Sequence, residues 1–186
     1  MNKKWIPSLI MATVLLMTGT AWSSGFSLAL KGGYFWPMDE VFKEVYTNGP
    51  VFGGEIAVRL VGGLDFWAGA DFFSKKGSLT FSEEETKVRI IPLHTGVRYR
   101  FSTSAVSPYL AAAAGYFLFK EESVIGTEEG NRFGFLGQAG ILAGLSRAVA
   151  LDVYVRYWAS KIPIEGFDEE ADLSGIQAGL GLAIRF

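Results

Sequence analysis

Eleven charged or titratable side chains stand in segments that are otherwise apolar or built of small residues, usually at alternate positions. Both signs occur, so the set could form a network of ion pairs. The set comprises Lys31, Glu55, Arg59, Asp65, Asp71, His94, Arg98, Arg100, Asp152, Arg156 and Arg185. Charges removed from water are tolerated when they are paired and hydrogen-bonded. The same set could instead line a narrow polar pathway for water or small solutes.

Other chemistry finds little support in these residues. His94 is the only histidine and there is no cysteine, whereas metal sites in proteins usually combine several such ligands. We therefore predict no metal centre, no cofactor and no catalytic residue, and we interpret His94 as a structural interior side chain. The 17 basic and 19 acidic residues give a net charge of −2, which does not favour a nucleic-acid partner.

Fifteen of the 19 acidic residues lie in four polar segments, 37–50, 75–86, 120–131 and 161–172. Clusters such as Glu121-Glu122, Glu128-Glu129 and Asp168-Glu169-Glu170 offer the carboxylate oxygens that Ca²⁺ and Mg²⁺ prefer. The commoner use of such clusters is solvated charge that keeps loops soluble. Both interpretations stay open at this point.

The elements that carry the charged set show period-two alternation, which is typical of strands with one apolar and one polar face. Eight such segments are found, at 26–36, 51–60, 64–74, about 87–101, 108–119, 132–145, 150–160 and 173–186. In the fourth, the alternation slips at Ile90-Ile91-Pro92, and we expect a bulge there because proline cannot donate to a ladder. In the segment 108–119, four alanines would also allow a helix, and the orientation of its faces is left open.

The ends and connections indicate where the chain travels. Lys3 and Lys4, an apolar stretch and a small-residue segment predict a signal peptide over 1–23, followed by one domain over 24–186. The connections 61–63, 102–107 and 146–149 are short, whereas the four acidic segments are long. An even number of strands with short turns at one end and long loops at the other is the layout of an outer-membrane barrel.

Aromatic residues on the apolar face gather in two bands, as they do at the two membrane interfaces. One band comprises Tyr34, Trp36, Phe52, Phe72 and Phe133, and the other comprises Phe26, Phe66, Tyr99, Phe101 and Phe186. We therefore expect the apolar face to point outward. Trp67, Phe73, Tyr154 and Trp158 then point inward with the charges, which favours a filled lumen over a pathway. The alternative is a soluble, lipocalin-like periplasmic binder with the faces reversed.

Three stretches, "IPLHTGVRYRF" (91–101), "SPYLAAAAGYF" (107–117) and the terminal "LSGIQAGLGLAIRF", resemble the small eight-stranded outer-membrane β-barrels, the group that includes OmpX-, OmpW- and OmpA-type barrels. The resemblance implies an all-β, eight-stranded antiparallel up-and-down barrel, monomeric, in the bacterial outer membrane. It also implies that Phe186 is read as a signal by the barrel assembly machinery. The other expected partners of the protein are outer-membrane lipids and lipopolysaccharide, with divalent cations at the acidic loops.

Function is expected to be non-enzymatic, either structural or in surface interactions through four acidic extracellular loops. Some barrels of this kind deacylate lipid A with a histidine and a serine that face lipid, whereas His94 falls on the inward face. The alternative function is a narrow channel or a lateral transporter for small, possibly hydrophobic solutes.

Overall fold

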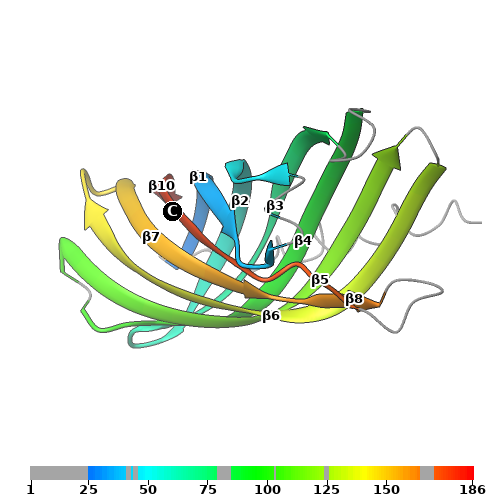
Figure 1. The fold of residues 1–186 in the computed structure, drawn as a ribbon. Helices are drawn as coiled ribbons and strands as arrows, with labels where there is room; N and C mark the ends of the chain where they lie inside the picture. Colours follow the sequence, from blue (N-terminus) through cyan, green and yellow to red (C-terminus); the bar gives the residue numbers. More distant parts are fainter. Residues whose placement is uncertain are drawn as a thin grey trace, which may run out of the picture.

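Eight long strands close into one antiparallel barrel (Figure 1). The computed structural model describes residues 25–40, 43, 46–78, 85–102, 104–123, 126–163 and 170–186. The strands of the barrel are β1 (Phe26–Pro37), β2 (Gly49–Val61), β3 (Leu64–Ser78), β4 (Glu85–Arg100), β5 (Val106–Ser123), β6 (Gly126–Gly144), β7 (Val149–Ala159) and β10 (Gly175–Arg185). Two short strands, β8 (Lys161–Pro163) and β9 (Glu170–Asp172), pair with each other in a separate sheet. The predicted fold class is confirmed.

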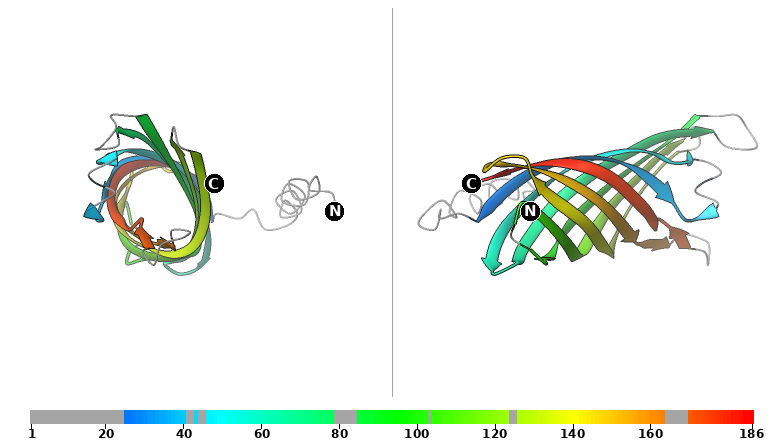
Figure 2. Two further views of the ribbon diagram at one scale, coloured as in Figure 1. Left: turned by 45° about the vertical axis from the view of Figure 1, so that its right-hand side comes forward. Right: turned by 90° about the vertical axis from the view of Figure 1, so that its left-hand side faces the viewer.

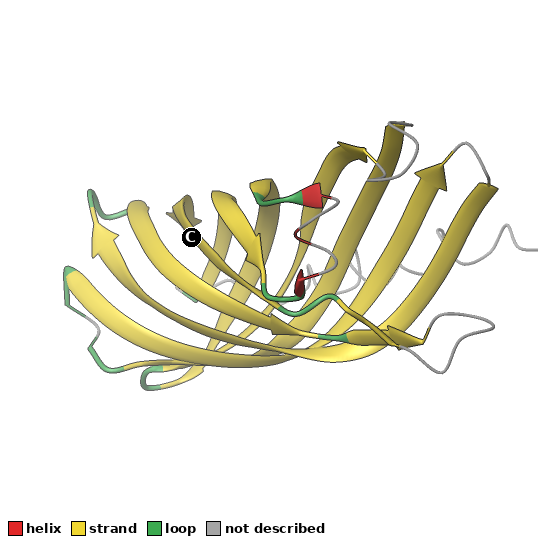
Figure 3. Cartoon of the chain, viewed as in Figure 1, coloured by secondary structure: helices red, strands yellow, loops and turns green. Residues whose placement is uncertain are grey.

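Each strand pairs with its neighbours in sequence, and β1 closes the ring against β10. The closing register runs from Ser27 opposite Arg185 to Pro37 opposite Gly175 without a break. The left view of Figure 2 shows the barrel roughly end-on, so that the strands form a ring, and Figure 3 shows how much of the described chain is strand. Because successive side chains of a strand point to opposite faces, closure separates a lumen face from an outer face over the whole barrel.

Strands extend further into the acidic segments than the alternation predicts. β3 continues to Ser78 and β4 begins at Glu85, so half of the predicted loop 75–86 is strand. Likewise β5 reaches Ser123 and β6 begins at Gly126, with Glu121 opposite Glu128 and Lys120 opposite Glu129. The prediction of loops a dozen residues long was wrong at these two places, because pairing between strands holds polar sequence in an extended form.

The bulge predicted at Ile90-Ile91-Pro92 was also wrong. Ile90 and Pro92 are both buried and Leu93 is exposed, so the alternation does not slip. Pairing of β3 with β4 stops after Ala70–Leu93 and resumes at Phe73–Ile90 in the same register, so the missing N–H of proline interrupts the ladder without shifting it. A register shift does occur elsewhere, between Arg59 and Val61 of β2, next to the β2–β3 turn.

The segment with four alanines is a strand throughout. In β5 the side chains of Tyr109, Ala113 and Phe117 are buried, whereas Leu110 and Leu118 are exposed. This settles the orientation that the sequence left open, with odd-numbered residues in the lumen. Among the described residues, no helix has the length and apolar character needed to cross a membrane.

Residues 1–24 lie outside the described residues, and so does the predicted signal peptide. The same holds for several acidic residues of the predicted loops, namely Glu44, Glu83, Glu84, Glu165, Asp168 and Glu169.

Candidate functional site in the barrel lumen

A network of charged side chains crosses the middle of the lumen, and Glu55 on β2 is its centre. Lys31 Nζ lies 2.7 Å from Glu55 Oε1, Arg98 Nη2 lies 2.5 Å from Oε2, and Arg156 Nη2 lies 2.5 Å from Oε1. These three cations come from β1, β4 and β7, and each of the four side chains is at least nine-tenths buried. One carboxylate therefore ties together strands on different sides of the barrel.

Two further carboxylates complete this layer. Asp152 lies 2.8 Å from Lys31 Nζ and accepts a hydrogen bond from the hydroxyl of Tyr109 at 2.9 Å. Asp71 accepts from Arg156 and lies 3.6 Å from Nδ1 of His94. We call these groups the central network, which comprises Lys31, Glu55, Asp71, His94, Arg98, Asp152 and Arg156. With three fixed cations and three carboxylates, its charges balance when His94 is neutral.

Neutral polar groups and rings fill the space around the central network. Gln138 accepts from Arg156 Nε at 2.9 Å and donates to the hydroxyl of Tyr109, while Gln177 donates to the hydroxyl of Tyr154 at 2.7 Å. The Lys31 ammonium lies 4.3 Å from the centre of the Tyr154 ring. These hydrogen bonds satisfy part of the polar groups that the lumen buries.

Towards the long-loop end the lumen becomes apolar. Phe35 stacks on Trp158 with ring centres 4.5 Å apart and meets the edge of Phe73 at 5.3 Å. Phe117 meets Trp158 edge-on, with ring centres 6.2 Å apart. These four rings are at most 1% exposed. We call them the aromatic layer.

Tyr46, from the segment between β1 and β2, packs against this aromatic cluster at the long-loop end. It donates to Glu121 at 2.5 Å and shares a hydrogen bond with Thr86 at 2.9 Å. Strand alternation carries no signal for this residue, because it lies in a predicted loop. Phe35, in contrast, has the same parity as Lys31, and that signal could have found it.

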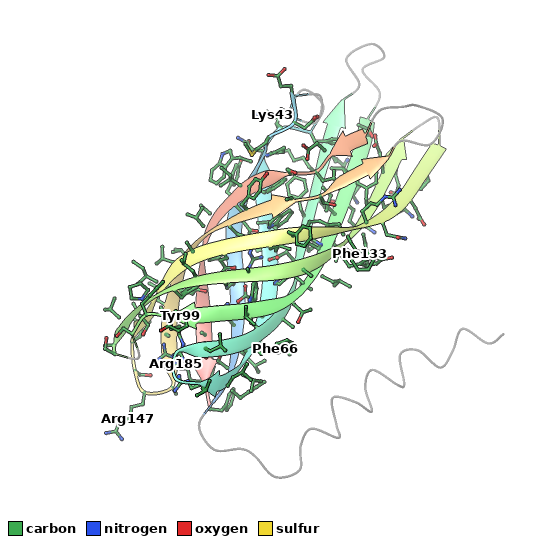
Figure 4. All side chains as sticks on the ribbon, turned by 90° about the horizontal axis from the view of Figure 1, so that it is seen from below. Lys43, Phe66, Tyr99, Phe133, Arg147 and Arg185 are labelled. Atoms are coloured by element: carbon green, nitrogen blue, oxygen red, sulfur yellow. The ribbon has the colours of Figure 1, made fainter. Side chains whose placement is uncertain are left out.

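Arginines crowd the opposite end of the lumen. A cavity of 390 Å³ opens there, and its charged lining residues are Arg59, Glu55, Asp65, Arg98, Arg100, Asp152, Arg185 and, from the β6–β7 turn, Arg147. Asp65 accepts a hydrogen bond from Arg100 Nη2 at 3.0 Å and lies within ion-pair distance of Arg100 Nε, at 2.8 Å, and of Arg59 Nε, at 3.9 Å. We call this space the mouth cavity. Figure 4 shows Arg147 and Arg185 towards the same end of the barrel as Tyr99, with Lys43 at the other end.

Most of the aromatic side chains predicted to form two bands are exposed on the outer face. Tyr34, Trp36, Phe52, Phe72 and Phe133 are 38–80% exposed, as are Phe66, Tyr99, Phe101 and Phe186 in the other band. Phe26 is half-buried, and its ring lies 5.8 Å from that of Phe186. Between the bands the face is aliphatic, with Leu30 78% exposed.

The acidic residues that the structure describes are partly paired at the long-loop end. Tyr116 lies opposite Phe133 of the aromatic band, and Lys120 lies four positions further towards the long-loop end. Lys120 contacts Glu129 at 2.9 Å and Glu122 at 3.2 Å. Hydrogen bonds to Glu129 and then Glu122 raise the pKa of Lys120 above its ordinary value. Within the described ranges no group of three or more His, Cys, Asp or Glu residues could hold a metal ion.

His94 is enclosed by protein. Its side chain is 4% exposed, and its ring lies 4.7 Å from that of Trp67. It therefore lies on the inward face, away from the lipid-facing position that a deacylase histidine would need.

Comparison with known structures identifies the fold. OprG from Pseudomonas aeruginosa matches with a TM-score of 0.69 at 13% identity, over 88% of this chain and 97% of OprG. Neisserial surface protein A matches with a TM-score of 0.59 at 19% identity, over 88% of this chain and 98% of its own chain. Ail of Yersinia pestis, solved with the heparin analogue sucrose octasulfate, matches with a TM-score of 0.58 at 14% identity, over 88% of this chain and 99% of the Ail chain.

No protein-family model matches the sequence, and no curated protein is similar enough in sequence to count as a relative. The structural neighbours include bacterial outer-membrane proteins. The resemblance predicted from the three sequence stretches is thus confirmed, and the chain has the fold of the small eight-stranded outer-membrane barrels.

Proposed function

We propose that this protein is a non-enzymatic barrel of the bacterial outer membrane whose own side chains close its lumen. Its role is structural or lies in interactions at the cell surface. The fold supports the membrane location, and so does an outer face that presents aliphatic side chains between two aromatic bands. A soluble lipocalin-like binder would carry exposed Leu30, Phe133 and Phe135, at 72–80% exposure, directly into water.

The observation that carries closure is the succession of the central network and the aromatic layer along the lumen. An eight-stranded barrel is just wide enough for side chains to fill, and here Arg156, Trp158 and Phe35 are 0–1% exposed. Closed this way, the barrel passes no ions through its axis. A narrow channel, the alternative, would need this filling to move aside.

Conductance in planar bilayers tests closure. The wild-type barrel is expected to be silent, whereas the double variant Phe35→Ala/Trp158→Ala opens the aromatic layer and gives current steps or added leak. Phe133→Ala removes an exposed ring of the outer face and is the matched control, expected to stay silent. Discrete steps from the wild-type protein would establish the channel instead.

Membrane location is tested by fractionation and by gel mobility with and without boiling. A mobility shift in the outer-membrane fraction is expected for a closed membrane barrel. Recovery of unshifted protein in the soluble periplasmic fraction would make the soluble binder the better function.

The surface role rests on acidic side chains at the long-loop end, such as Glu122 and Glu129. We propose that they contact lipopolysaccharide through shared divalent cations, since carboxylate oxygens suit Ca²⁺ and Mg²⁺. Replacing the acids of 120–131 by their amides should then weaken binding of Ca²⁺ to the barrel in lipopolysaccharide-containing bilayers. If Ca²⁺ binding is unchanged, these acids serve only to keep the loops soluble.

The absence of an enzymatic role is supported by His94 lying inside the barrel. Mass spectrometry of lipid A from cells with and without the protein is expected to show the same acyl chains. A lost or gained chain would contradict this part of the proposal.

A further inference from the structure

The mouth cavity concentrates positive charge at the end of the barrel where the short turns and the C-terminus lie. Five arginines from four separate elements line it: Arg59 on β2, Arg98 and Arg100 on β4, Arg147 in the β6–β7 turn, and Arg185 on β10. The acids in its wall are Glu55, Asp65 and Asp152. The cavity thus gathers basic side chains that are far apart in the sequence.

The acids of the wall neutralise these arginines only in part, since Glu55 pairs with Arg98 and Asp65 pairs with Arg100. Glu55 and Asp152 already contact Lys31, and Glu55 also contacts Arg98 and Arg156 in the central network. That leaves Asp65 alone, which is engaged with Arg100 and more distantly with Arg59.

Two arginines of the cavity are left without an acidic partner. Among the residues that the structure describes, neither Arg147 nor Arg185 lies within ion-pair distance of an acid. The mouth cavity therefore holds excess positive charge in a partly enclosed space.

Buried donor atoms in the wall point to the same conclusion. Nη2 of Arg185 is buried without a hydrogen-bond partner among the described residues, and the same holds for Nε of Arg98. Arg98 lines the cavity and is only 5% exposed. A buried donor left without a partner is costly, so an acceptor that enters the cavity would be held strongly.

We propose that the mouth cavity binds a small phosphate-bearing anion. The planar fork of arginine matches a phosphate with two parallel hydrogen bonds, and several arginines around one space give a specific site for it. At 390 Å³ the cavity has the size of a small-molecule site, which leaves room for an ester group beside the phosphate.

Two sources of this phosphate chemistry reach the site. Arg147 is exposed and the side chain of Arg59 is 40% exposed, so soluble phosphate esters can enter from the aqueous side. Phe26 and Phe186 line the cavity and also belong to the aromatic band on the outer face, so a lipid head group can lie at the same rim. The site does not depend on whether the lumen conducts.

The first arm of the test uses barrel folded in dodecyl maltoside, a detergent without phosphate, and titrates it with glycerol 3-phosphate in a calorimeter. Saturable binding is expected. It should weaken about tenfold in Arg185→Gln and again in Arg59→Gln/Arg185→Gln, which corresponds to the loss of charge-assisted hydrogen bonds. Arg132→Gln removes an exposed arginine on β6 outside the cavity and should bind like the wild type.

The second arm asks whether the barrel retains phosphatidylglycerol through dilution into maltoside, with native mass spectrometry as the readout. Retention by the wild type that is lost in Arg59→Gln/Arg185→Gln assigns the site to a lipid head group. Saturable glycerol 3-phosphate binding without retention assigns it to a soluble ester.

Each variant must first show the wild-type mobility shift on unboiled gels, so that unfolding is not mistaken for lost binding. No saturable binding and no retention in the wild type overturns the proposal. Binding or retention that is equal in the double variant and the wild type overturns it as well.

Discussion

Replacing Glu55, the centre of the central network, by glutamine should strongly destabilise the barrel. Glu55 is 5% exposed and accepts three cations at 2.5–2.7 Å. Glutamine has nearly the same shape but no charge, so the central network would hold one more cation than carboxylates. Removing one partner of a buried ion pair costs about 3–5 kcal/mol, and we expect the unfolding free energy of Glu55→Gln to fall by that amount.

A second substitution separates charge from packing. Lys31 contacts both Glu55 and Asp152 and is 4% exposed, so Lys31→Met removes the excess cation and keeps an unbranched apolar stem. In the double variant Glu55→Gln/Lys31→Met we expect a coupling of about 1–3 kcal/mol in the favourable direction. Glu129→Gln is the control, because the 65% exposed side chain of Glu129 pairs with Lys120 at the surface, where ion pairs contribute little.

The assay is reversible urea unfolding of the barrel in phospholipid vesicles, followed by tryptophan fluorescence and by gel mobility without boiling. Trp67 and Trp158 are buried in the lumen and report directly on its packing. The predicted loss of stability is refuted if the unfolding free energy of Glu55→Gln lies within about 0.5 kcal/mol of the wild-type value, which is roughly the effect of a neutral surface change. The central network would then not stabilise the barrel. A loss in the double variant equal to the sum of the losses in Glu55→Gln and Lys31→Met alone would instead assign the cost to packing.

Three further predictions concern the two faces of the wall and the end of the chain. A methyl group at Gly140 would lie 2.6 Å from the hydroxyl of Tyr109, so Gly140→Ala should lower the unfolding free energy by about 1–3 kcal/mol in the same assay. Gly137→Ala on the same strand is the control and should cost little, because a methyl group there would meet nothing within 4 Å. Equal effects of the two substitutions would contradict a lumen filled by side chains. Leu30→Arg should lower stability in bilayers by about 2–4 kcal/mol if this face meets lipid, and a change below 0.5 kcal/mol would refute that orientation. Deleting Phe186 should reduce the heat-modifiable barrel recovered from cells but leave refolding into detergent nearly unchanged; normal recovery would mean that Phe186 is not an assembly signal.

Much of this fold can be predicted from alternation alone, because a closed barrel gives every strand two different environments. Lys31, Glu55 and Asp71 stand at alternate positions among glycine, alanine and bulky apolar residues, and the structure buries all three. The four acids outside the acidic segments, Glu55, Asp65, Asp71 and Asp152, are all buried in the lumen. Outside β5 and the stretch around Pro92, period two was therefore enough to sort side chains between the faces.

Local sequence could not predict where strands end or how proline is accommodated. Glu121, Glu122 and Lys120 look like loop residues, but pairing across β5 and β6 keeps them in strands. At Pro92, the neighbours on β5 hold the register while pairing with β3 is interrupted. Both outcomes depend on partners distant in the chain.

The candidate sites also depend on residues that alternation does not reach. Arg147 lies in a turn of four residues and Tyr46 in a connection between strands, where no period indicates direction. The contacts within the central network were likewise unpredictable in detail, since they require the relative heights of strands on opposite sides of the ring. The composition of the lumen was predictable, but its pairing was not.

The position of Glu55 has a consequence for how the barrel is completed. Its partners lie on β1, β4 and β7, and the contact with Arg156 joins residues 101 positions apart. In a sheet that has not yet closed, Lys31 still lies beside Glu55 on the adjacent strand, but Arg156 is separated from Glu55 and Asp152 is separated from Lys31. Buried charges without partners are strongly unfavourable, so closure between β1 and β10 supplies the missing ion pairs and these contacts favour the complete ring over an open sheet.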